Sequence, residues 1–457
     1  MKAQDLRGNK VLIIGTGISG IGSAKLLGKA GAVPVILDEN TKVYEREVRT
    51  KLEGYSGEEP EIIIGQLPDE KIKEIVLVVP SPAVPMDSPI MLRLKDAGIP
   101  VWSEIELAYN FAKGRMVAIT GTNGKTTTTT LVGEIMAAHF ASTYVVGNIG
   151  YSYAERALEM TDDTVSIGEI SSFQLEAVEN FHASVSAILN ITPDHLNRHH
   201  TMECYASMKE NITNNQTKED TCVLNYDNEY TRAFADRCPA KVVFFSSASK
   251  LENGYYLADD EIMYAENGNA SVVMNVHDMN LVGTCNYENV MAAIAMGRAM
   301  DVPMETILKV VHDFKAVEHR IEFVATKNGV TYYNDSKGTN PDAAIQGIKA
   351  MCRPTYLIGG GYDKGSEYDE WINAFDGKVK KLVLIGATKE KIAQCADKNG
   401  FHDYVFMDSF KDALKYCSDN AVPGDAVLLS PACASWDMFP SYEVRGKQFK
   451  DYVNSLK

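Results

Sequence analysis

Along this 457-residue chain, apolar and polar positions recur in a fixed order: a short apolar run, a glycine-rich turn and a stretch of helical length. Short runs rich in Val and Ile are typical of strands buried on both faces of a parallel sheet, and helices must then connect them. In the first part of the chain this pattern predicts strands at 11–14, 33–37 and 75–79, with a helix through residue 30 after the first.

The same order continues to the C-terminus. The pattern predicts strands at 116–120, 165–170 and 185–191, alternating runs at 242–245 and 271–276, and further strands at 330–333, 355–358, 382–385 and 426–429; helices are expected at 125–140, 286–300 and 304–314. A chain of this length divides into several domains. We therefore predict an α/β protein of three domains. With the glycine-rich turns at 15–20 and 121–127, these are a Rossmann-like domain at 1–102, a central P-loop ATPase-like parallel-sheet domain at 103–316, and a C-terminal Rossmann-like α/β domain at 317–457.

Composition narrows the class of protein. Hydrophobic residues make up 45% and charged residues 23% of the chain, which excludes a disordered protein. No apolar run reaches the length of a membrane span and no signal-peptide core follows the N-terminus, so a cytoplasmic location is expected. The net charge of −16 disfavours nucleic-acid binding. Eight scattered cysteines without a C-x-x-C pair indicate free, buried thiols rather than disulfides or a zinc site.

The most specific chemical signal is G-T-N-G-K-T-T at 121–127, between an apolar strand and a helix. Glycines let backbone N–H groups turn toward phosphate oxygens, and the helix N-terminus adds partial positive charge. Lys125 would bridge the β- and γ-phosphates, and Thr126 would offer its hydroxyl to Mg²⁺. Ile119 replaces the first glycine of the general P-loop, so the loop is a shorter variant. A glycine- and threonine-rich turn without a ligand is the alternative.

A second glycine motif follows the first strand. Gly15, Gly17 and Gly20 have the G-x-G-x-x-G spacing, and Asp38 ends the next strand, which satisfies the dinucleotide fingerprint. Taken alone, the motif suggests a nicotinamide-dependent oxidoreductase. Only about 100 residues precede the second phosphate loop, however, which is short of the two βαβαβ halves that a whole dinucleotide needs.

Other candidate residues each have a plain structural explanation as well. Glu169 at a strand end is a metal ligand or a solvated acid. His195, in the dense polar run 194–199, belongs to a site or caps a helix. Lys209 lies on a predicted helix, where a solvated lysine is the usual case. Asn286 and Asn289 open a helix and could simply cap it.

The chain resembles the Mur ligase family and the related folylpolyglutamate synthases. The resemblance is carried by G-T-N-G-K-T-T at 121–127, E-I-S-S-F-Q-L at 169–175, N-I-T-P-D-H-L-N-R-H at 190–199, N-D-S-K-G-T-N-P at 334–341 and L-S-P-A-C-A-S-W-D-M-F at 429–439. These segments span all three predicted domains and are most similar to the branch of the family that adds D-glutamate. The resemblance implies an ATP-dependent ligase that joins D-glutamate to UDP-N-acetylmuramoyl-L-alanine through an acyl phosphate.

The resemblance also implies roles for individual residues. Catalytic roles fall to Lys125, His195 and Lys209, the last as a carbamate, and two Mg²⁺ ions would be held by Thr126, Glu169, His195 and Lys209. ATP would contact Gly121, Thr122, Asn123, Gly124, Lys125, Thr126, Thr127, Asn286, Asn289, Arg320 and Asp335; the UDP substrate would contact Gly15, Gly17, Ile18, Ser19, Gly20, Asp38, Asn148 and His195; D-glutamate would contact Lys337, Thr339, Lys364, Ser435, Trp436 and Tyr442. A monomer is expected, although the oligomeric state stays open.

Several alternatives remain. Another amino-acid ligase of the same superfamily is the nearest, although a folylpolyglutamate synthase should lack the first glycine-motif domain. The ligase that adds the third, diamino acid usually carries D-N-P-R, which is absent here. A nicotinamide oxidoreductase would bind NAD, and a non-catalytic nucleotide switch would need neither His195 nor Lys209.

Overall fold

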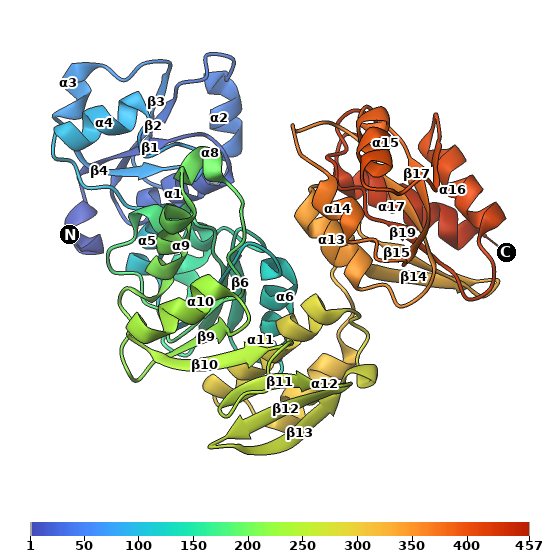
Figure 1. The fold of residues 1–457 in the computed structure, drawn as a ribbon. Helices are drawn as coiled ribbons and strands as arrows, with labels where there is room; N and C mark the ends of the chain where they lie inside the picture. Colours follow the sequence, from blue (N-terminus) through green and yellow to red (C-terminus); the bar gives the residue numbers. More distant parts are fainter. Residues whose placement is uncertain (1, 457) are drawn as a thin grey trace. The chain divides into compact units, whose positions relative to one another are not determined.

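The computed structural model describes residues 2–456, which form two compact units (Figure 1). One unit contains the chain up to Met274 together with Glu288–Val311, and the other contains Asn275–Tyr287 and the chain from His312 onward. The first unit holds two of the three sheets, and the second unit holds the third.

The first sheet is four-stranded and parallel, in the order β3-β2-β1-β4. Its strands are β1 (Lys10–Ile14), β2 (Val33–Asp38), β3 (Glu61–Ile64) and β4 (Ile75–Pro80), and its helices are α1 (Ile18–Lys29), α2 (Glu45–Lys51), α3 (Asp69–Ile72) and α4 (Pro89–Asp96). The parallel sheet predicted for this region is confirmed. The pattern missed β3, because four residues are too few to show a period.

The second sheet has nine strands in the order β13-β12-β11-β10-β9-β8-β5-β7-β6. The strands are β5 (Arg115–Thr120), β6 (Thr143–Gly147), β7 (Val165–Glu169), β8 (Val185–Ile188), β9 (Thr221–Asn225), β10 (Lys241–Ser246), β11 (Gly254–Ala258), β12 (Glu261–Glu266) and β13 (Asn269–Asn275). From β6 to β10 the neighbours run parallel, and the carboxyl ends of β5, β7 and β8 therefore meet at one edge.

Helices of two kinds accompany this sheet. The longer ones are α5 (Glu104–Phe111), α6 (Lys125–Ala137), α9 (Met202–Glu210), α11 (Thr284–Ala299) and α12 (Met304–Asp313), and the short ones are α7 (Tyr153–Arg156), α8 (Leu196–His199) and α10 (Glu229–Phe234). One hydrophobic core joins the first sheet to this one: Val11 and Ile13 share it with Trp102, Ile105 and Ala118. Helix α1 packs on α5 and α7, so the two phosphate-type loops belong to one packed body.

The third sheet has six strands in the order β14-β15-β19-β16-β17-β18. The strands are β14 (Glu322–Lys327), β15 (Val330–Asn334), β16 (Thr355–Gly359), β17 (Val379–Leu384), β18 (Tyr404–Phe406) and β19 (Ala426–Leu429), and the helices are α13 (Pro341–Lys349), α14 (Asp369–Asn373), α15 (Lys389–Lys398), α16 (Phe410–Asn420) and α17 (Tyr442–Ser455). All pairs are parallel except the antiparallel β14–β15 hairpin at the edge of the sheet. The pattern of apolar runs did not predict β14.

Two predicted elements end three residues earlier than expected. The helix expected at 125–140 ends at Ala137, after which the His139 and Phe140 rings pack edge to face. The strand expected at 185–191 ends at Ile188, because Asn190 leaves the sheet to bond the phosphate loop. The domain boundaries after residues 102 and 316 stay a prediction.

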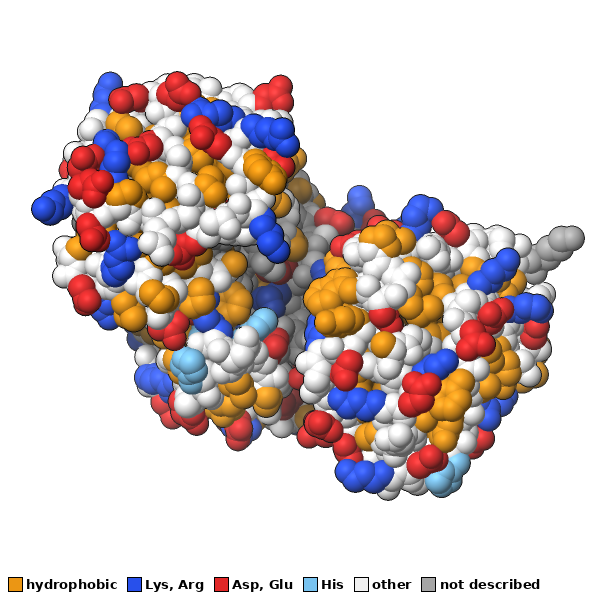
Figure 2. All heavy atoms as spheres, turned by 90° about the horizontal axis from the view of Figure 1, so that it is seen from above, with side chains coloured by type: hydrophobic (Ala, Val, Ile, Leu, Met, Phe, Trp, Pro, Cys, Tyr) orange, Lys and Arg blue, Asp and Glu red, His pale blue; other side chains and the backbone are white. Residues whose placement is uncertain are grey.

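The membrane, charge and cysteine expectations drawn from the composition can be compared with the structure. No helix within residues 2–456 is long and apolar enough to cross a membrane. Acidic and basic side chains are intermingled over the visible face of each unit (Figure 2). All eight cysteines are free, but the expectation of burial was only partly right: four are buried, and Cys352 is exposed.

Candidate active site

The loop at 121–127 has the geometry of a phosphate-binding turn. It connects β5 to α6 at the carboxyl edge of the second sheet. Gly121 and Gly124 have φ of 150° and 84°, which side chains with a Cβ adopt at a cost. A Cβ at Gly124 would also lie 2.3 Å from Asn289 Oδ1. Backbone conformation therefore favours glycine at both positions, and a Cβ at Gly124 would also force the Asn289 side chain to shift.

The segment after β8 clamps this loop from the side. Asn123 N donates to Asn190 Oδ1 at 2.8 Å, and Asn190 Nδ2 donates back to the Asn123 carbonyl at 3.1 Å. The Thr122 hydroxyl donates to the Thr192 carbonyl at 3.2 Å and accepts from Thr192 N at 3.1 Å. Asn190 and Thr192 were not predicted as supports of this loop. Their place just after the strand next to β5 is the signal that could have indicated them.

Two lysines converge on one carbonyl of the loop. Lys125 Nζ donates to the carbonyls of Gly121 at 2.9 Å and Thr122 at 3.0 Å. Lys209 Nζ, from α9, donates to the same Gly121 carbonyl at 2.9 Å and lies 4.6 Å from the Tyr205 ring centroid. Lys209 is only 2% exposed. Burial, and next the charge of Lys125, hold the pKa of Lys209 well below its ordinary value.

Glu169 supplies a carboxylate at the same edge. It ends β7, next to β5, and is 1% exposed. Asn148 Nδ2 donates to Glu169 Oε1 at 2.8 Å, whereas Oε2 is buried and has no hydrogen-bond partner among the described residues. An orphaned carboxylate oxygen is costly inside a protein unless a cation meets it. It is the hard oxygen donor that Mg²⁺ prefers.

Among residues 2–456 there is no group of three or more His, Cys, Asp or Glu side chains that could hold a metal ion. The predicted metal ligands are not a group of this type, because they combine Glu169 and His195 with the Thr126 hydroxyl and a modified Lys209. The buried Oε2 of Glu169 beside a phosphate loop fits Mg²⁺, because a nucleotide's phosphates would complete the ligand set.

His195 belongs to an aromatic cluster beside Lys209. Its ring centroid lies 4.9 Å from that of Phe173 and 6.4 Å from that of Tyr205, and its backbone is left-handed, with φ of 53°. Burial lowers the pKa of His195, which favours the neutral imidazole. His199, which no motif had singled out for a role, packs between Phe173 and Tyr205 and lies 3.0 Å from Ser172 Oγ.

The two candidate asparagines of α11, Asn286 and Asn289, have different hydrogen-bond partners. Asn289 Oδ1 accepts from Thr128 Oγ1 at 3.2 Å, so this side chain lies against the phosphate-loop helix. Asn286 Nδ2 donates to the Val282 carbonyl at 2.8 Å, which is a local contact at the helix start. Their predicted adenine contacts stay a prediction.

The N-terminal glycine loop is held by Asp38. Thr16 donates to Asp38 Oδ2 through its N–H at 3.2 Å and its hydroxyl at 2.6 Å, and Asn40 N donates to Oδ1 at 3.0 Å. A Cβ at Gly20 would lie 2.0 Å from the Gly15 carbonyl oxygen. Ile18, at the start of α1, is 81% exposed. The N-terminus of α1 is therefore open to solvent at Ile18. Asp38, in contrast, already accepts hydrogen bonds from Thr16 and Asn40.

In the second unit, Asp335 and Arg320 lie together. Ser430 Oγ donates to Asp335 Oδ2 at 2.7 Å, and burial raises the pKa of Asp335 to about 7 against the opposing charge of Arg320. Arg320 Nε is buried without a hydrogen-bond partner among the described residues. An unused cationic donor of this kind fits a phosphate or carboxylate ligand.

The six residues predicted to contact D-glutamate all lie in the second unit. Lys337 N donates to the His319 carbonyl at 3.0 Å, and Thr339 N donates to that of Lys337 at 2.8 Å. Lys337 Nζ lies 5.7 Å from the Tyr442 ring centroid and Lys364 Nζ lies 5.5 Å from that of Trp436. Ser435 is buried, and Trp436 is 63% exposed.

Arg445 ties the two segments that carry these residues, and sequence reasoning missed it. Its guanidinium is 1% exposed. It donates to Ser336 Oγ and the Ser336 carbonyl at 3.0 and 2.8 Å, and to the Cys433 carbonyl at 3.2 and 3.3 Å. Burial lowers the pKa of Arg445 to about 10. No local pattern distinguishes this arginine from a surface residue of α17.

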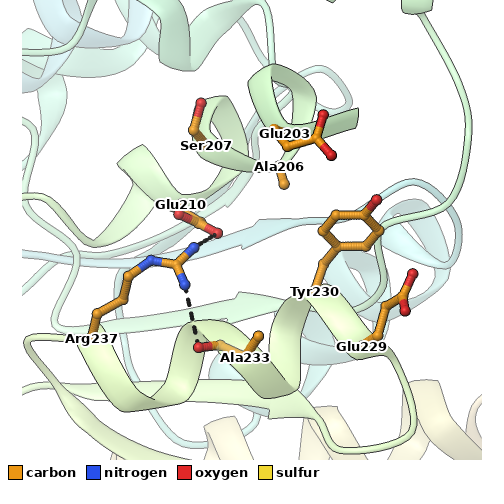
Figure 3. A pocket seen from close by; sticks show the side chains of 8 residues that line it. All are labelled: Glu203, Ala206, Ser207, Glu210, Glu229, Tyr230, Ala233 and Arg237. Atoms are coloured by element: carbon orange, nitrogen blue, oxygen red, sulfur yellow. Dashed lines mark hydrogen bonds and ion pairs between the residues drawn. The ribbon is translucent and has the colours of Figure 1, made fainter. Parts of the chain in front are cut away.

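A cavity of about 420 Å³ lies between α9 and α10, lined by Glu203, Ala206, Ser207, Glu210, Glu229, Tyr230, Ala233 and Arg237. Figure 3 shows the Arg237 guanidinium directed at both Glu210 and the Ala233 carbonyl. None of the predicted site residues lines it. Its lining does include Glu210, the neighbour of Lys209 on α9.

Comparisons with known proteins agree with this arrangement. The sequence matches, in chain order, the MurD-like N-terminal domain of Mur ligases over residues 9–103, the Mur ligase middle domain over 119–297 and the Mur ligase glutamate ligase domain over 319–433. It is similar to the UDP-N-acetylmuramoylalanine–D-glutamate ligase of Lachnospira eligens, with 58% identity across 99% of this chain and 100% of that one. The protein of the same name from Clostridioides difficile is 46% identical, with the same coverage.

Solved structures share the fold. The UDP-N-acetylmuramate-alanine ligase MurC of Thermotoga maritima has a TM-score of 0.58 at 18% identity, over 98% of this chain and 99% of that one. The UDP-N-acetylmuramoylalanyl-D-glutamyl-2,6-diaminopimelate–D-alanyl-D-alanyl ligase of Acinetobacter baumannii has a TM-score of 0.61 at 14% identity, over 97% and 93%. The predicted fold class of three α/β domains is confirmed.

Proposed function

The chain belongs to the Mur ligase family, and from this premise we propose that it adds D-glutamate to UDP-N-acetylmuramoyl-L-alanine with hydrolysis of ATP. The choice of amino acid follows the relatives named UDP-N-acetylmuramoylalanine–D-glutamate ligase, which match this chain over 99–100% of their length. One structural observation supports the proposal most strongly: Lys125 Nζ and the buried Lys209 Nζ both donate to the Gly121 carbonyl of the phosphate loop.

The chemistry explains the need for ATP. A carboxylate is a poor electrophile, because its leaving group would be oxide. An oxygen of the L-alanine carboxylate attacks the γ-phosphorus, ADP leaves, and an acyl phosphate remains. The nitrogen of D-glutamate then attacks the acyl carbon, loses a proton, and the tetrahedral intermediate collapses to the amide and inorganic phosphate. The protein contributes positioning and charge neutralisation more than covalent help.

In the first unit the phosphate loop and α6 would hold the triphosphate. Lys125 Nζ, which donates to the carbonyls of Gly121 and Thr122, would turn to the β- and γ-phosphates at the N-terminus of α6. Thr126, Glu169 and His195 would hold Mg²⁺, which neutralises phosphate charge when bound. The buried, unpartnered Oε2 of Glu169 supports this role.

Lys209 would serve as a carbamate. A buried ammonium beside Lys125 repels a metal ion, so an unmodified lysine is unsuitable as a ligand. The neutral amine adds to CO₂ and releases one proton, which converts it into an anion with two hard oxygens. Burial favours the neutral amine that this reaction requires.

The remaining roles are the binding of the UDP substrate and of D-glutamate. The uncovered loop from Gly15 to Gly20 would hold the diphosphate of the UDP substrate at the N-terminus of α1, with Ile18 and Ser19 beside it. In the second unit, Thr339 and Lys364 would bind one carboxylate of D-glutamate and Ser435 the other, with Lys337, Trp436 and Tyr442 around them.

Product analysis tests the proposal. The protein is incubated with ATP, UDP-N-acetylmuramoyl-L-alanine and, in turn, D-glutamate, L-glutamate and a diamino acid, and products are identified by mass spectrometry. We expect one amide product, formed with D-glutamate, together with stoichiometric ADP and phosphate. Equal turnover of L-glutamate, or turnover of the diamino acid alone, would refute the assignment. NAD binding in a parallel titration would favour the oxidoreductase alternative.

A further inference from the structure

In the second unit, three side chains form a cluster at the carboxyl ends of β16 and β19: Tyr362, Lys364 and Trp436. The Tyr362 and Trp436 ring centroids lie 5.5 Å apart with an interplanar angle of 56°. Lys364 Nζ lies 5.5 Å from the Trp436 ring centroid. Backbone pairing brings the two loops together, because Tyr362 N donates to the Ala434 carbonyl at 2.9 Å.

Core packing does not explain the place of Trp436. Its side chain is 63% exposed, whereas the other two tryptophans, Trp102 and Trp371, are fully buried. The backbone beside it is nevertheless fixed, since Ser435 is buried and its carbonyl accepts from Met438 N at 3.0 Å and Phe439 N at 2.8 Å. The fold thus holds a large indole in solvent on a rigid turn, where its exposed face meets an ammonium.

The Lys364 ammonium contacts an aromatic ring rather than a carboxylate, and this affects how far its charge is neutralised. A carboxylate partner would neutralise the ammonium and compete with an incoming substrate carboxylate. The neighbouring acid, Asp363, pairs instead with Lys391 at 3.4 Å, and Lys364 takes part in no ion pair within the described part of the chain. An indole attracts the ammonium through its quadrupole and supplies no anion, so the full positive charge stays available.

We propose that Trp436, supported by Tyr362, is a positioning residue that holds the Lys364 ammonium over the amino-acid pocket, ready for the side-chain carboxylate of D-glutamate. The inference rests on the proposed function and adds a residue pair to it. Holding the ammonium by a ring lowers the conformational cost of ordering a long lysine when the dicarboxylate binds. Exposed cation–π contacts correspond to about a two- to fivefold effect on binding.

Kinetics of the full chain test this pairing. In Trp436→Leu we expect KM for D-glutamate to rise about two- to fivefold, kcat to stay within twofold and KM for ATP to stay constant; Trp436→Phe should lie between. Lys364→Met should raise KM further, and in that background Trp436→Leu should add nothing, since the ring then has no cation to hold. Phe406→Leu removes a comparably exposed aromatic ring of the same unit and should leave the kinetics at parent values.

Fluorescence gives a second readout. Because Trp436 is the exposed tryptophan of the three, titration with D-glutamate should shift the emission of the parent to shorter wavelength, and the shift should vanish in Trp436→Phe. If Trp436→Leu raises KM equally with and without Lys364, or if the emission does not respond, the positioning role is wrong although the ligase assignment stands. Absence of D-glutamate ligation by the parent chain would overturn both.

Discussion

Replacing Arg445 with methionine should destabilise the second unit and weaken D-glutamate binding together. The guanidinium is 1% exposed and bridges Ser336 to Cys433. Its removal leaves the carbonyls of both residues buried and unpaired, at about 1–3 kcal/mol each. The Ser336 hydroxyl loses less, because it still donates to the Tyr442 carbonyl at 2.8 Å.

A favourable effect partly offsets this loss. Burial lowers the pKa of Arg445 to about 10 from 12.5, which indicates that the buried charge itself costs roughly 3 kcal/mol at 1.36 kcal/mol for each pKa unit. Removing one partner of a buried charged network nevertheless destabilises by about 3–5 kcal/mol in general. We take about 3 kcal/mol as the net loss for Arg445→Met, which for a unit of this size lowers Tm by roughly 6–12 °C.

Differential scanning calorimetry of the full chain measures the effect on the transition of the second unit. Arg445→Lys keeps a charge but loses the planar fork, so its Tm should fall by about half as much. Lys447→Met, on the same helix, removes an exposed ion pair with Asp451 and should change Tm by less than about 2 °C. A drop below about 2 °C in Arg445→Met would show that the guanidinium does not hold the two segments, and an unchanged KM for D-glutamate would show that those segments do not form its pocket.

Three further expectations concern single residues. Lys125→Ala should lower kcat at least about 10²-fold, about 2.7 kcal/mol, with little change in Tm; a variant within about threefold of the parent would contradict an ATP site at this loop. Lys209→Ala should lose most activity and regain part of it with acetate, whereas Lys209→Arg should not recover, because its guanidinium keeps the charge and fills the space; a fully active Lys209→Ala would end the carbamate hypothesis. Because burial raises the pKa of Asp335 from 3.8 to about 7, its stabilising contribution is complete below about pH 4 and is lost as the pH rises to about 7; the Tm of Asp335→Asn should therefore fall less than that of the parent between these values, and parallel Tm–pH curves would refute the shift.

Local sequence predicted most of the elements that carry the site. The strand β19 was predicted with its observed bounds, and β5 to within one residue, because both are apolar runs limited by polar or turn residues. Glycine spacing located both loops, because positive φ and close backbone approach leave few other residues possible. Predictions failed where the period is short or another segment intervenes: β3 has four residues, β14 pairs as an antiparallel edge, and Asn190 leaves its strand for the loop.

Local backbone preference and period in the sequence were therefore enough to predict the α/β class, to locate the two glycine loops and to select Lys125 as the candidate phosphate-loop lysine. The sequence also indicated Glu169, from its place at a strand end, and Lys209, which only the resemblance singled out. Tertiary structure alone decided that Lys209 is buried against the Gly121 carbonyl, that one oxygen of Glu169 is buried without a partner, and that Arg445 joins Ser336 to Cys433. These facts depend on which distant segments meet, and desolvation of a charge is set by everything packed around it rather than by its neighbours in the chain.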